Sequence, residues 1–476
     1  MQTAVASTAA RPLAPAPDQV AGVPGSDHIK IANLRWRGGT GEHSTVTFDL
    51  SWDGSWRAAW TEPADRNVTG KPLKIESWDV AWVFVKFRMP GANVFSHATL
   101  STEAADHGKS DGVALDVGLT DDRAKGVGVF IYRSGVGHGS NQFKNITLRW
   151  LHGADRADPG KAKLAVHAIA MVYVPEGPFV SKSPWGHPLT RITTGDPRRP
   201  GGHLGSDPCT VPGSEQWPNG YKAFYCMKHS IRQGQYAEFL NSVASDLGAA
   251  SYNVQRYGAL AHNNPRRYSA KTYKFSGYTI KYSPDEARYE AEATGRACNF
   301  LSWPDILSFT AWAGLRPPTN LEYEKACRGS RAVARAEDAW APATCAPAEG
   351  LREVVPTVTV ALGPGPSYWG IWDLSLSGCV QEWPAVVQNE PANPGQKGAG
   401  VAFKGTHGSG SPQVPEDWPW TAFGDWYYGG IWRLRGYGNV GNWIAISDLD
   451  RMPGYWESVD ANRTGRHGAR AVRTAP

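Results

Sequence analysis

The first third of the chain alternates hydrophobic and polar residues in short runs, which is the pattern of half-buried β-strands. In "STVTFDLSW", Val46, Phe48 and Leu50 would share one face of such a strand. Further β-rich runs are "WDVAWVFVKFR", "GVGVFIYR", "NITLRWLHG" and "KLAVHAIAMVYV", separated by turns rich in Gly, Asp and Asn. Short strands at this spacing predict an antiparallel β-sandwich over residues 28–167.

Helical spacing of apolar residues begins only after this region. "SIRQGQYAEFLNSVASDL" and "LSWPDILSFTAWAGL" both place large apolar side chains three and four residues apart, which predicts two helices. In "RPPTNLEYEKACRG", the two prolines exclude helix, and Thr319 and Glu322 have the spacing of a capping box. This stretch therefore predicts a short bracing helix that ends at Gly329, and we interpret it as scaffold.

Beyond Gly350 regular periodicity disappears, and the chain becomes rich in aromatic and turn residues. We interpret this part as long loops held by aromatic anchors. The two halves together predict an α+β protein. Residues 1–27, rich in Ala and Pro, are expected to form a flexible arm.

Composition and charge exclude several classes of function. Apolar residues make up 41% of the 476 residues, but no apolar run approaches the 18 residues that a transmembrane segment needs. The net charge is only +5, without a dense Lys/Arg block, which argues against nucleic-acid binding. The N-terminus lacks the apolar stretch of a secretory signal, so export would need another route or a trimmed precursor.

The six cysteines all lie in the second part of the chain, and no pair has the CxxC spacing of a zinc knuckle. Their number allows disulfides, but their pairing cannot be deduced from the sequence. Buried free thiols are the equally open alternative.

Five motifs in order resemble the formylglycine-generating enzyme, or sulfatase-modifying factor, family. They are "MVYVPEGPF", "SIRQGQYAEFL", "RPPTNLEYEKACRG", "GIWDLSLSGCVQEW" and the closing "GARAVR". The resemblance implies a variant of the C-type lectin fold over residues 168–476. The preceding sandwich is similar to one found before this domain in some bacterial members, so a bacterial cell surface or extracellular location is favoured.

The departures from the family pattern bear on function. Family enzymes bind copper through two cysteines upstream of the closing motif, and this chain has no cysteine between residues 380 and 476. We therefore expect neither formylglycine formation nor a resident cofactor. The resemblance also leaves calcium open, with Glu382 as its retained ligand. Cys379 stands where the family has Asn, and a thiol is a poor calcium ligand.

We interpret the chain as a non-catalytic binding or display protein whose C-terminal loops bind a protein or glycan. Tyr and Trp supply contact area at low entropic cost, and Asn and Asp supply adaptable hydrogen bonds. Some members of this fold are variable proteins that carry such residues in this region. The candidate binding residues are Tyr437, Asn439, Asn442, Trp443, Asp448, Asp450, Tyr455, Trp456, Asp460 and Asn462.

Two alternatives remain open at this point. The chain could be an oxidoreductase of the same family that uses a different metal site. It could also be a structural subunit that assembles into a homo-oligomer or fibre, with the N-terminal arm joining one copy to the next.

Overall fold

A ten-stranded antiparallel sheet forms the centre of the protein in the computed structural model. The structure describes residues 29–38, 41–181, 190–196, 216–243, 278–301, 303–330, 367–372, 374, 381–382, 384–385, 403–418 and 467–476. The strands of the sheet are β1 (Lys30–Gly38), β2 (Ser44–Glu62), β3 (Leu73–Arg88), β4 (Ser96–His97), β5 (Val113–Leu119), β6 (Gly126–Arg133), β7 (Gly137–Trp150), β8 (Lys163–Val174), β11 (Phe224–Met227) and β16 (Val472–Thr474).

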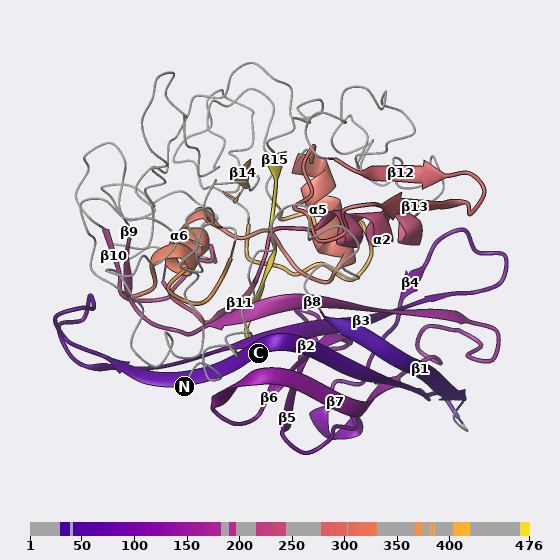
Figure 1. The fold of residues 1–476 in the computed structure, drawn as a ribbon, viewed down its shortest axis with the longest axis horizontal. Helices are drawn as coiled ribbons and strands as arrows, with labels where there is room; N and C mark the ends of the chain where they lie inside the picture. The colour runs from indigo at the N-terminus through magenta and orange to yellow at the C-terminus, as the bar shows by residue number, and fades with distance from the viewer. Residues whose placement is uncertain are drawn as a thin grey trace, which may run out of the picture.

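Two long strands, β2 and β3, each exchange one neighbour for another along their length. The first part of β2 pairs with β1 and β7, and its last residues, Arg57–Glu62, pair with β3. From Asp79 onward, β3 pairs with β8 and, over a short stretch, with β6 on its other edge. Hydrogen bonding therefore continues without a break from the N-terminal strands to β8, β11 and β16 (Figure 1).

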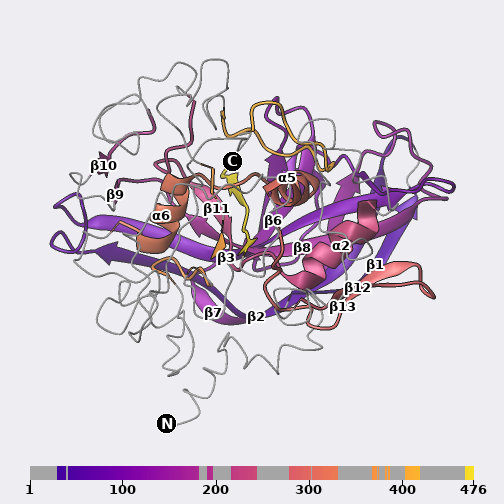
Figure 2. The same ribbon diagram turned by 90° about the horizontal axis from the view of Figure 1, so that it is seen from above.

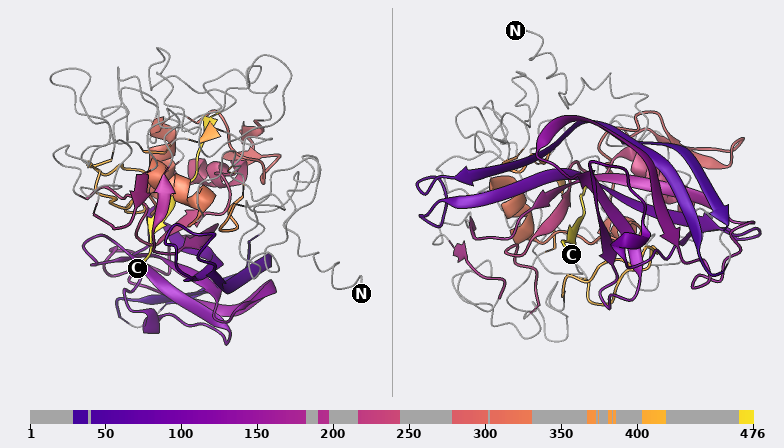
Figure 3. Two further views of the ribbon diagram at one scale, coloured as in Figure 1. Left: turned by 90° about the vertical axis from the view of Figure 1, so that its left-hand side faces the viewer. Right: turned by 90° about the horizontal axis from the view of Figure 1, so that it is seen from below.

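β3 is buried on both of its faces. Val80, Trp82 and Phe84 lie in a core that they share with the helices, whereas Ala81, Val83 and Val85 lie in a second core formed with β2 and β7. Figures 1 and 3 show the helices on one side of this strand and the β2–β7 part of the sheet on the other. Burial on both faces explains why β3 reads as a nearly continuous apolar run rather than an alternating one.

The predicted boundary between residues 167 and 168 falls inside β8. This strand pairs with β3 along one edge and with β11 along the other. The closing motif supplies β16, which pairs with β11. The predicted sandwich region and the region of family resemblance thus share one sheet, and β8 contributes to both.

The remaining elements are short. They are the helices η3 (Ala104–Asp106), α2 (Gln233–Val243), α5 (Trp303–Trp312) and α6 (Asn320–Arg328), and three two-stranded sheets made of β9 (Phe179–Ser181) with β10 (Thr190–Ile192), β12 (Ile280–Ser283) with β13 (Arg288–Ala291), and β14 (Gln381–Glu382) with β15 (His467–Gly468). Seen from above, α2, α5 and α6 lie over the long strands (Figure 2). A large antiparallel sheet with few helices in the described residues is consistent with the predicted α+β class and equally with a mostly-β protein. Within the described part of the chain, no helix is both long and apolar enough to cross a bilayer.

The predicted capping box is present at the start of α6. Thr319 Oγ1 accepts a hydrogen bond from the Glu322 amide at 3.1 Å, and Glu322 Oε2 accepts one from the Thr319 amide at 3.0 Å. Gly329 ends the helix with a φ of 72°, a conformation that favours glycine. Local sequence alone is enough to specify both ends of this helix.

A buried ion pair joins the N-terminal strands to β11. Asp79, at 1% exposure, accepts hydrogen bonds from Trp52 Nε1 at 3.0 Å, Ser55 Oγ at 2.8 Å and the Trp56 amide at 3.0 Å. Lys228, directly after β11, completes the set with Nζ at 2.9 Å from Asp79 Oδ2. Since β2 bulges between Trp52 and Ser55, the carboxylate also holds this irregularity in place.

Replacement of Lys228 by Met should destabilise the protein strongly, because it leaves the Asp79 carboxylate buried without its cation. We expect a loss of about 3–5 kcal/mol in the free energy of unfolding, measured by urea denaturation at neutral pH. Lys281→Met is the matched control. Its ion pair with Glu292 has the similar length of 2.7 Å, but the two side chains are 60% and 68% exposed. That change should leave stability nearly unaltered. Equal effects of the two substitutions would contradict this account of burial.

Candidate functional site

The predicted binding residues from Tyr437 to Asn462 all lie outside the described residues. What the structure describes is the protein on either side of them. Trp418 precedes them, is buried at 1% exposure, and donates from Nε1 to the Thr406 carbonyl at 2.7 Å. His467 and Gly468 follow them as β15, which pairs in parallel with β14. The chain on both sides of the predicted recognition segment is therefore anchored in the protein interior.

Glu382 in β14 is part of a buried ion pair. Its Oε2 atom lies 2.6 Å from Arg470 Nε, and neither residue is more than 3% exposed. The same guanidinium donates to the carbonyls of Met227 at 3.0 Å and Trp372 at 2.9 Å. Although burial opposes the charge, the Glu382 carboxylate holds the pKa of Arg470 above its usual value.

This arrangement fits an internal ion pair better than a calcium ligand. A guanidinium already occupies one carboxylate oxygen of Glu382, and its charge would repel a second cation there. Calcium prefers six to eight oxygen ligands. Among the described residues, no group of three His, Cys, Asp or Glu side chains is placed to hold a metal ion.

The motif around α6 carries charges that face the interior rather than the solvent. Arg316 binds Glu322 through two hydrogen bonds of 2.6 and 2.7 Å. Glu324 and Arg328 form a second pair, in which both side chains are completely buried. The sequence predicted this stretch to be scaffold, but not that its charged positions would be buried. The two ion pairs form within the stretch itself, and Arg328 also donates to the Val180 carbonyl at 2.6 Å.

The buried amine of Lys325 is surrounded by backbone carbonyls rather than by a carboxylate. Its Nζ donates to the carbonyls of Pro175 at 2.7 Å, Gly220 at 2.8 Å and Tyr221 at 3.1 Å. Burial lowers the pKa of Lys325 to about 7. The lysine joins the start of the family region to α6, and all three donors of its ammonium group are used.

Three cysteines are described, and each is a buried free thiol. They are Cys226, Cys298 and Cys327. Burial raises the pKa of Cys226 to about 12, and it raises the pKa values of Cys298 and Cys327 well above the usual value for a thiol. The thiolate is the form that binds copper, so these cysteines are poor metal ligands at neutral pH. For these three, free thiols replace the disulfide alternative.

An aspartate–histidine pair was missed by sequence reasoning. His407 Nδ1 lies 2.8 Å from Asp121 Oδ1, and its Nε2 accepts a hydrogen bond from the Thr474 amide at 3.1 Å. Because both ring nitrogens are engaged, the imidazole has no free nitrogen with which to act as a base. Burial lowers the pKa of His407 to about 3. Through Asp121, which follows β5, and Thr474 of β16, His407 connects residues 403–418 to the sheet.

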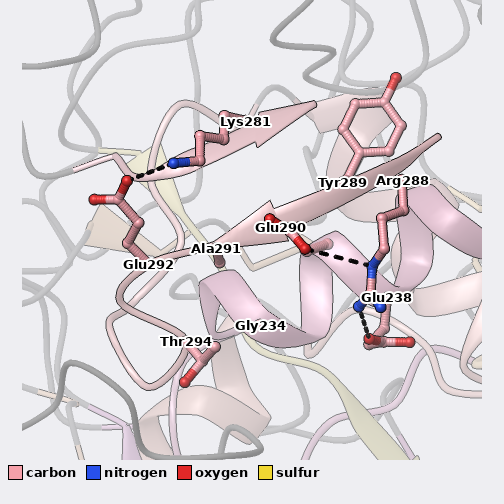
Figure 4. A pocket seen from close by; sticks show the side chains of 10 residues that line it. Gly234, Glu238, Lys281, Arg288, Tyr289, Glu290, Ala291, Glu292 and Thr294 are labelled. Carbon is pink, nitrogen blue, oxygen red and sulfur yellow. Dashed lines mark hydrogen bonds and ion pairs between the residues drawn. The ribbon is translucent and has the colours of Figure 1, made fainter. Parts of the chain in front are cut away.

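A surface groove of about 370 Å³ lies between α2 and the β12–β13 hairpin (Figure 4). Asn241 holds the two elements together through both backbone groups of Tyr289, at 2.7 and 2.9 Å. Lys281 pairs with Glu292 at 2.7 Å, and Arg288 lies between Glu238 at 4.0 Å and Glu290 at 3.9 Å. Every charged side chain of the groove has an opposite charge within it, so the groove by itself indicates no ligand.

The buried thiols should be unreactive in the folded protein. At pH 8, iodoacetamide should leave Cys226, Cys298 and Cys327 unmodified, because they are buried and remain protonated. In denaturant the same residues should be alkylated, and peptide mass spectrometry distinguishes the two states. Modification of Cys226 or Cys327 in the native protein, at the rate seen in denaturant, would contradict the burial described here.

Comparison with known proteins agrees with this scaffold. A model of the sulfatase-modifying factor enzyme 1-like domain matches residues 157–417, more than half of the 476-residue chain. The match begins just before β8 and includes β11, α2, α5 and α6. No curated protein matches the chain. With the five ordered motifs and the extent of this match, the chain belongs to the sulfatase-modifying factor (formylglycine-generating enzyme) family.

Proposed function

We propose that this chain is a binding protein that retains the family scaffold without its copper-dependent oxidase chemistry. The observation that carries the proposal is the absence of any cysteine between residues 380 and 476, where family enzymes have their copper pair. Copper(I) needs soft thiolate ligands. The described cysteines lie elsewhere, buried and protonated.

We infer a C-type lectin-like fold for the family region, as the family resemblance implies. In support of this inference, β8 and β16, from the two ends of that region, both pair with β11, one on each side of it. Such an arrangement leaves long connections free to form a recognition surface. Folds of this kind serve recognition as well as catalysis.

We place the recognition surface in the segment between Trp418 and His467. On one side Trp418 is buried, and on the other His467 and Gly468 pair with β14, so the segment begins and ends at anchored positions. Its composition, rich in Tyr, Trp, Asn and Asp, suits a protein or glycan ligand, because binding energy concentrates in aromatic anchors surrounded by polar groups.

The N-terminal strands would attach the protein to a partner, a surface or a second copy. β1 stands at the end of the sheet order, and two apolar side chains on it, Leu34 and Trp36, are 36% and 43% exposed. An edge strand with exposed apolar residues favours association. Light scattering of wild-type protein beside a Leu34→Ser/Trp36→Ser variant tests this part of the proposal. A monomer in both cases would argue against self-association.

The absence of oxidase activity has a direct test. Purified protein incubated with copper, oxygen and a Cys-x-Pro-x-Arg peptide should leave the peptide thiol unchanged by mass spectrometry, whereas a family enzyme with the cysteine pair serves as the positive control. Conversion of the thiol to an aldehyde at turnover rates would overturn the proposal. Stoichiometric iron or copper in the protein as purified would instead favour an oxidoreductase with a different metal site.

Binding and stability should separate when two kinds of position are compared. Alanine at Trp443, Tyr455 or Trp456 should weaken partner binding by about 1–3 kcal/mol at a true anchor and change thermal stability little. Leu321, at 1% exposure within the core around α6, is the matched control. Leu321→Ala should cost about 2–5 kcal/mol of stability through the cavity that it leaves. A comparable loss of stability at Trp443 would mean that this residue belongs to the core.

A further inference from the structure

Three basic side chains meet where the sheet contacts α5 and residues 403–418. Lys86 comes from β3, His97 from β4 and His167 from β8, and we call them the basic corner. The two imidazoles pack against the Phe84 ring, with centroid distances of 5.8 Å for His97 and 5.2 Å for His167. The Trp312 ring of α5 lies 5.1 Å from the His167 ring and 4.8 Å from Lys86 Nζ.

Residues 403–418 are seated directly on this corner. Lys86 Nζ donates to the Trp312 carbonyl at 2.7 Å and also to the Gly410 carbonyl. The Gly410 backbone lies against the His97 ring so closely that a Cβ built there would be 2.1 Å from the ring. The segment is further held to α5 and its end by Gly408 N to Leu315 O at 2.8 Å and Gly410 N to Ala311 O at 3.0 Å.

The titratable groups that act on the two imidazoles are all basic, and burial also lowers the pKa of one of them, Lys86, well below its usual value. His97 faces Lys86 of β3, His167 of β8 and Arg473 of β16, and His167 faces Lys86. From α5 and residues 403–418 the contacts are an indole ring and backbone carbonyls, not carboxylates. Positive charge that develops here would therefore meet no compensating anion among the described neighbours.

The hydrogen bonding of the two rings also fits their neutral form. His97 Nε2 is 2.5 Å from the Val127 carbonyl, so that nitrogen carries the hydrogen. His97 Nδ1 and His167 Nε2 are buried and have no hydrogen-bond partner. Burial, and then the charge of Lys86, lower the pKa of His97 well below its usual value and that of His167 to about 3. A proton added to either free nitrogen would have no acceptor.

We propose that the basic corner is a pH-sensitive latch, which holds residues 403–418 on the sheet while both histidines are neutral and releases them as the pH falls. In the open state the imidazoles are solvated and titrate near pH 6.5, whereas the closed state resists protonation. Because opening is linked to proton uptake, the open population should rise about 30-fold per histidine between pH 7.5 and pH 5.

The latch goes beyond the proposed function, since it concerns only how residues 403–418 are held. Trp418, at the end of the segment, directly precedes the predicted recognition surface. Any effect of the latch on ligand binding would therefore rest on the proposed function.

Hydrogen exchange measured by mass spectrometry on the full chain tests the latch without any ligand. Peptides from residues 403–418 are compared at pH 7.5 and pH 5, with rates corrected for intrinsic exchange. Wild-type protein should lose protection there at pH 5. The variant His97→Gln/His167→Phe should lose clearly less protection than the wild type, with His407 supplying the pH effect that remains. Gln can still donate to Val127, and Phe fills the space beside Phe84 and Trp312.

Two further variants identify the origin of any pH effect. His138→Gln, at an exposed position far from the corner in sequence, should behave as wild type. The variant His407→Gln, on the segment itself, should still show the part of the pH-dependent loss of protection that comes from His97 and His167. The proposal fails if the double variant loses protection as the wild type does, or if His407→Gln alone abolishes the effect. If the double variant does not fold at pH 7.5, His97→Gln alone applies the same criterion, with about 30-fold expected, because His97 is the histidine of the corner that contacts Gly410.

Discussion

The central constraint in this protein is that β3 is buried on both faces. A strand in that position contributes to two cores, and a charged residue in its buried part has to find its partners inside the protein. Two charged residues of β3, Asp79 and Lys86, are buried in this way. Asp79 receives four hydrogen bonds, including one from Lys228, and Lys86 donates to carbonyls of α5 and residues 403–418. Through Asp79 and Lys86, β3 is therefore hydrogen-bonded to elements on both sides of the sheet as well as packed against them.

The same principle recurs around α6 and the closing motif. Arg316 with Glu322, Arg328 with Glu324 and Arg470 with Glu382 are all buried pairs of short length. Breaking a buried pair is costly, whereas forming it adds little net stability, so such pairs favour one arrangement over its competitors. Because their charges are paired inside the protein, the motif residues can be polar and still form a scaffold. In the closing motif, the Arg470 guanidinium occupies one carboxylate oxygen of Glu382, the retained motif carboxylate.

Under the proposed function, family membership and oxidase chemistry are separable in this chain. The family match over residues 157–417 covers a scaffold that includes β8, β11, α2, α5 and α6. The resemblance implies a copper-binding cysteine pair upstream of the closing motif, and no cysteine lies between residues 380 and 476. The buried ion pairs around α6 and the closing motif involve no cysteine, so these contacts do not depend on such a pair.

Local patterns in the sequence are enough to predict the strand-rich N-terminal region, the helices α2, α5 and α6, the Thr319–Glu322 capping box, and the family. Periodicity and capping act over a few residues, so a single sequence contains them. Other features follow from the folded arrangement: β8 lies between β3 and β11, His407 contacts Asp121, and Lys86, His97 and His167 share one corner. These contacts join residues tens to hundreds of positions apart. They depend on which strands become neighbours, and the sequence pattern of one strand does not specify which strand will pair with it.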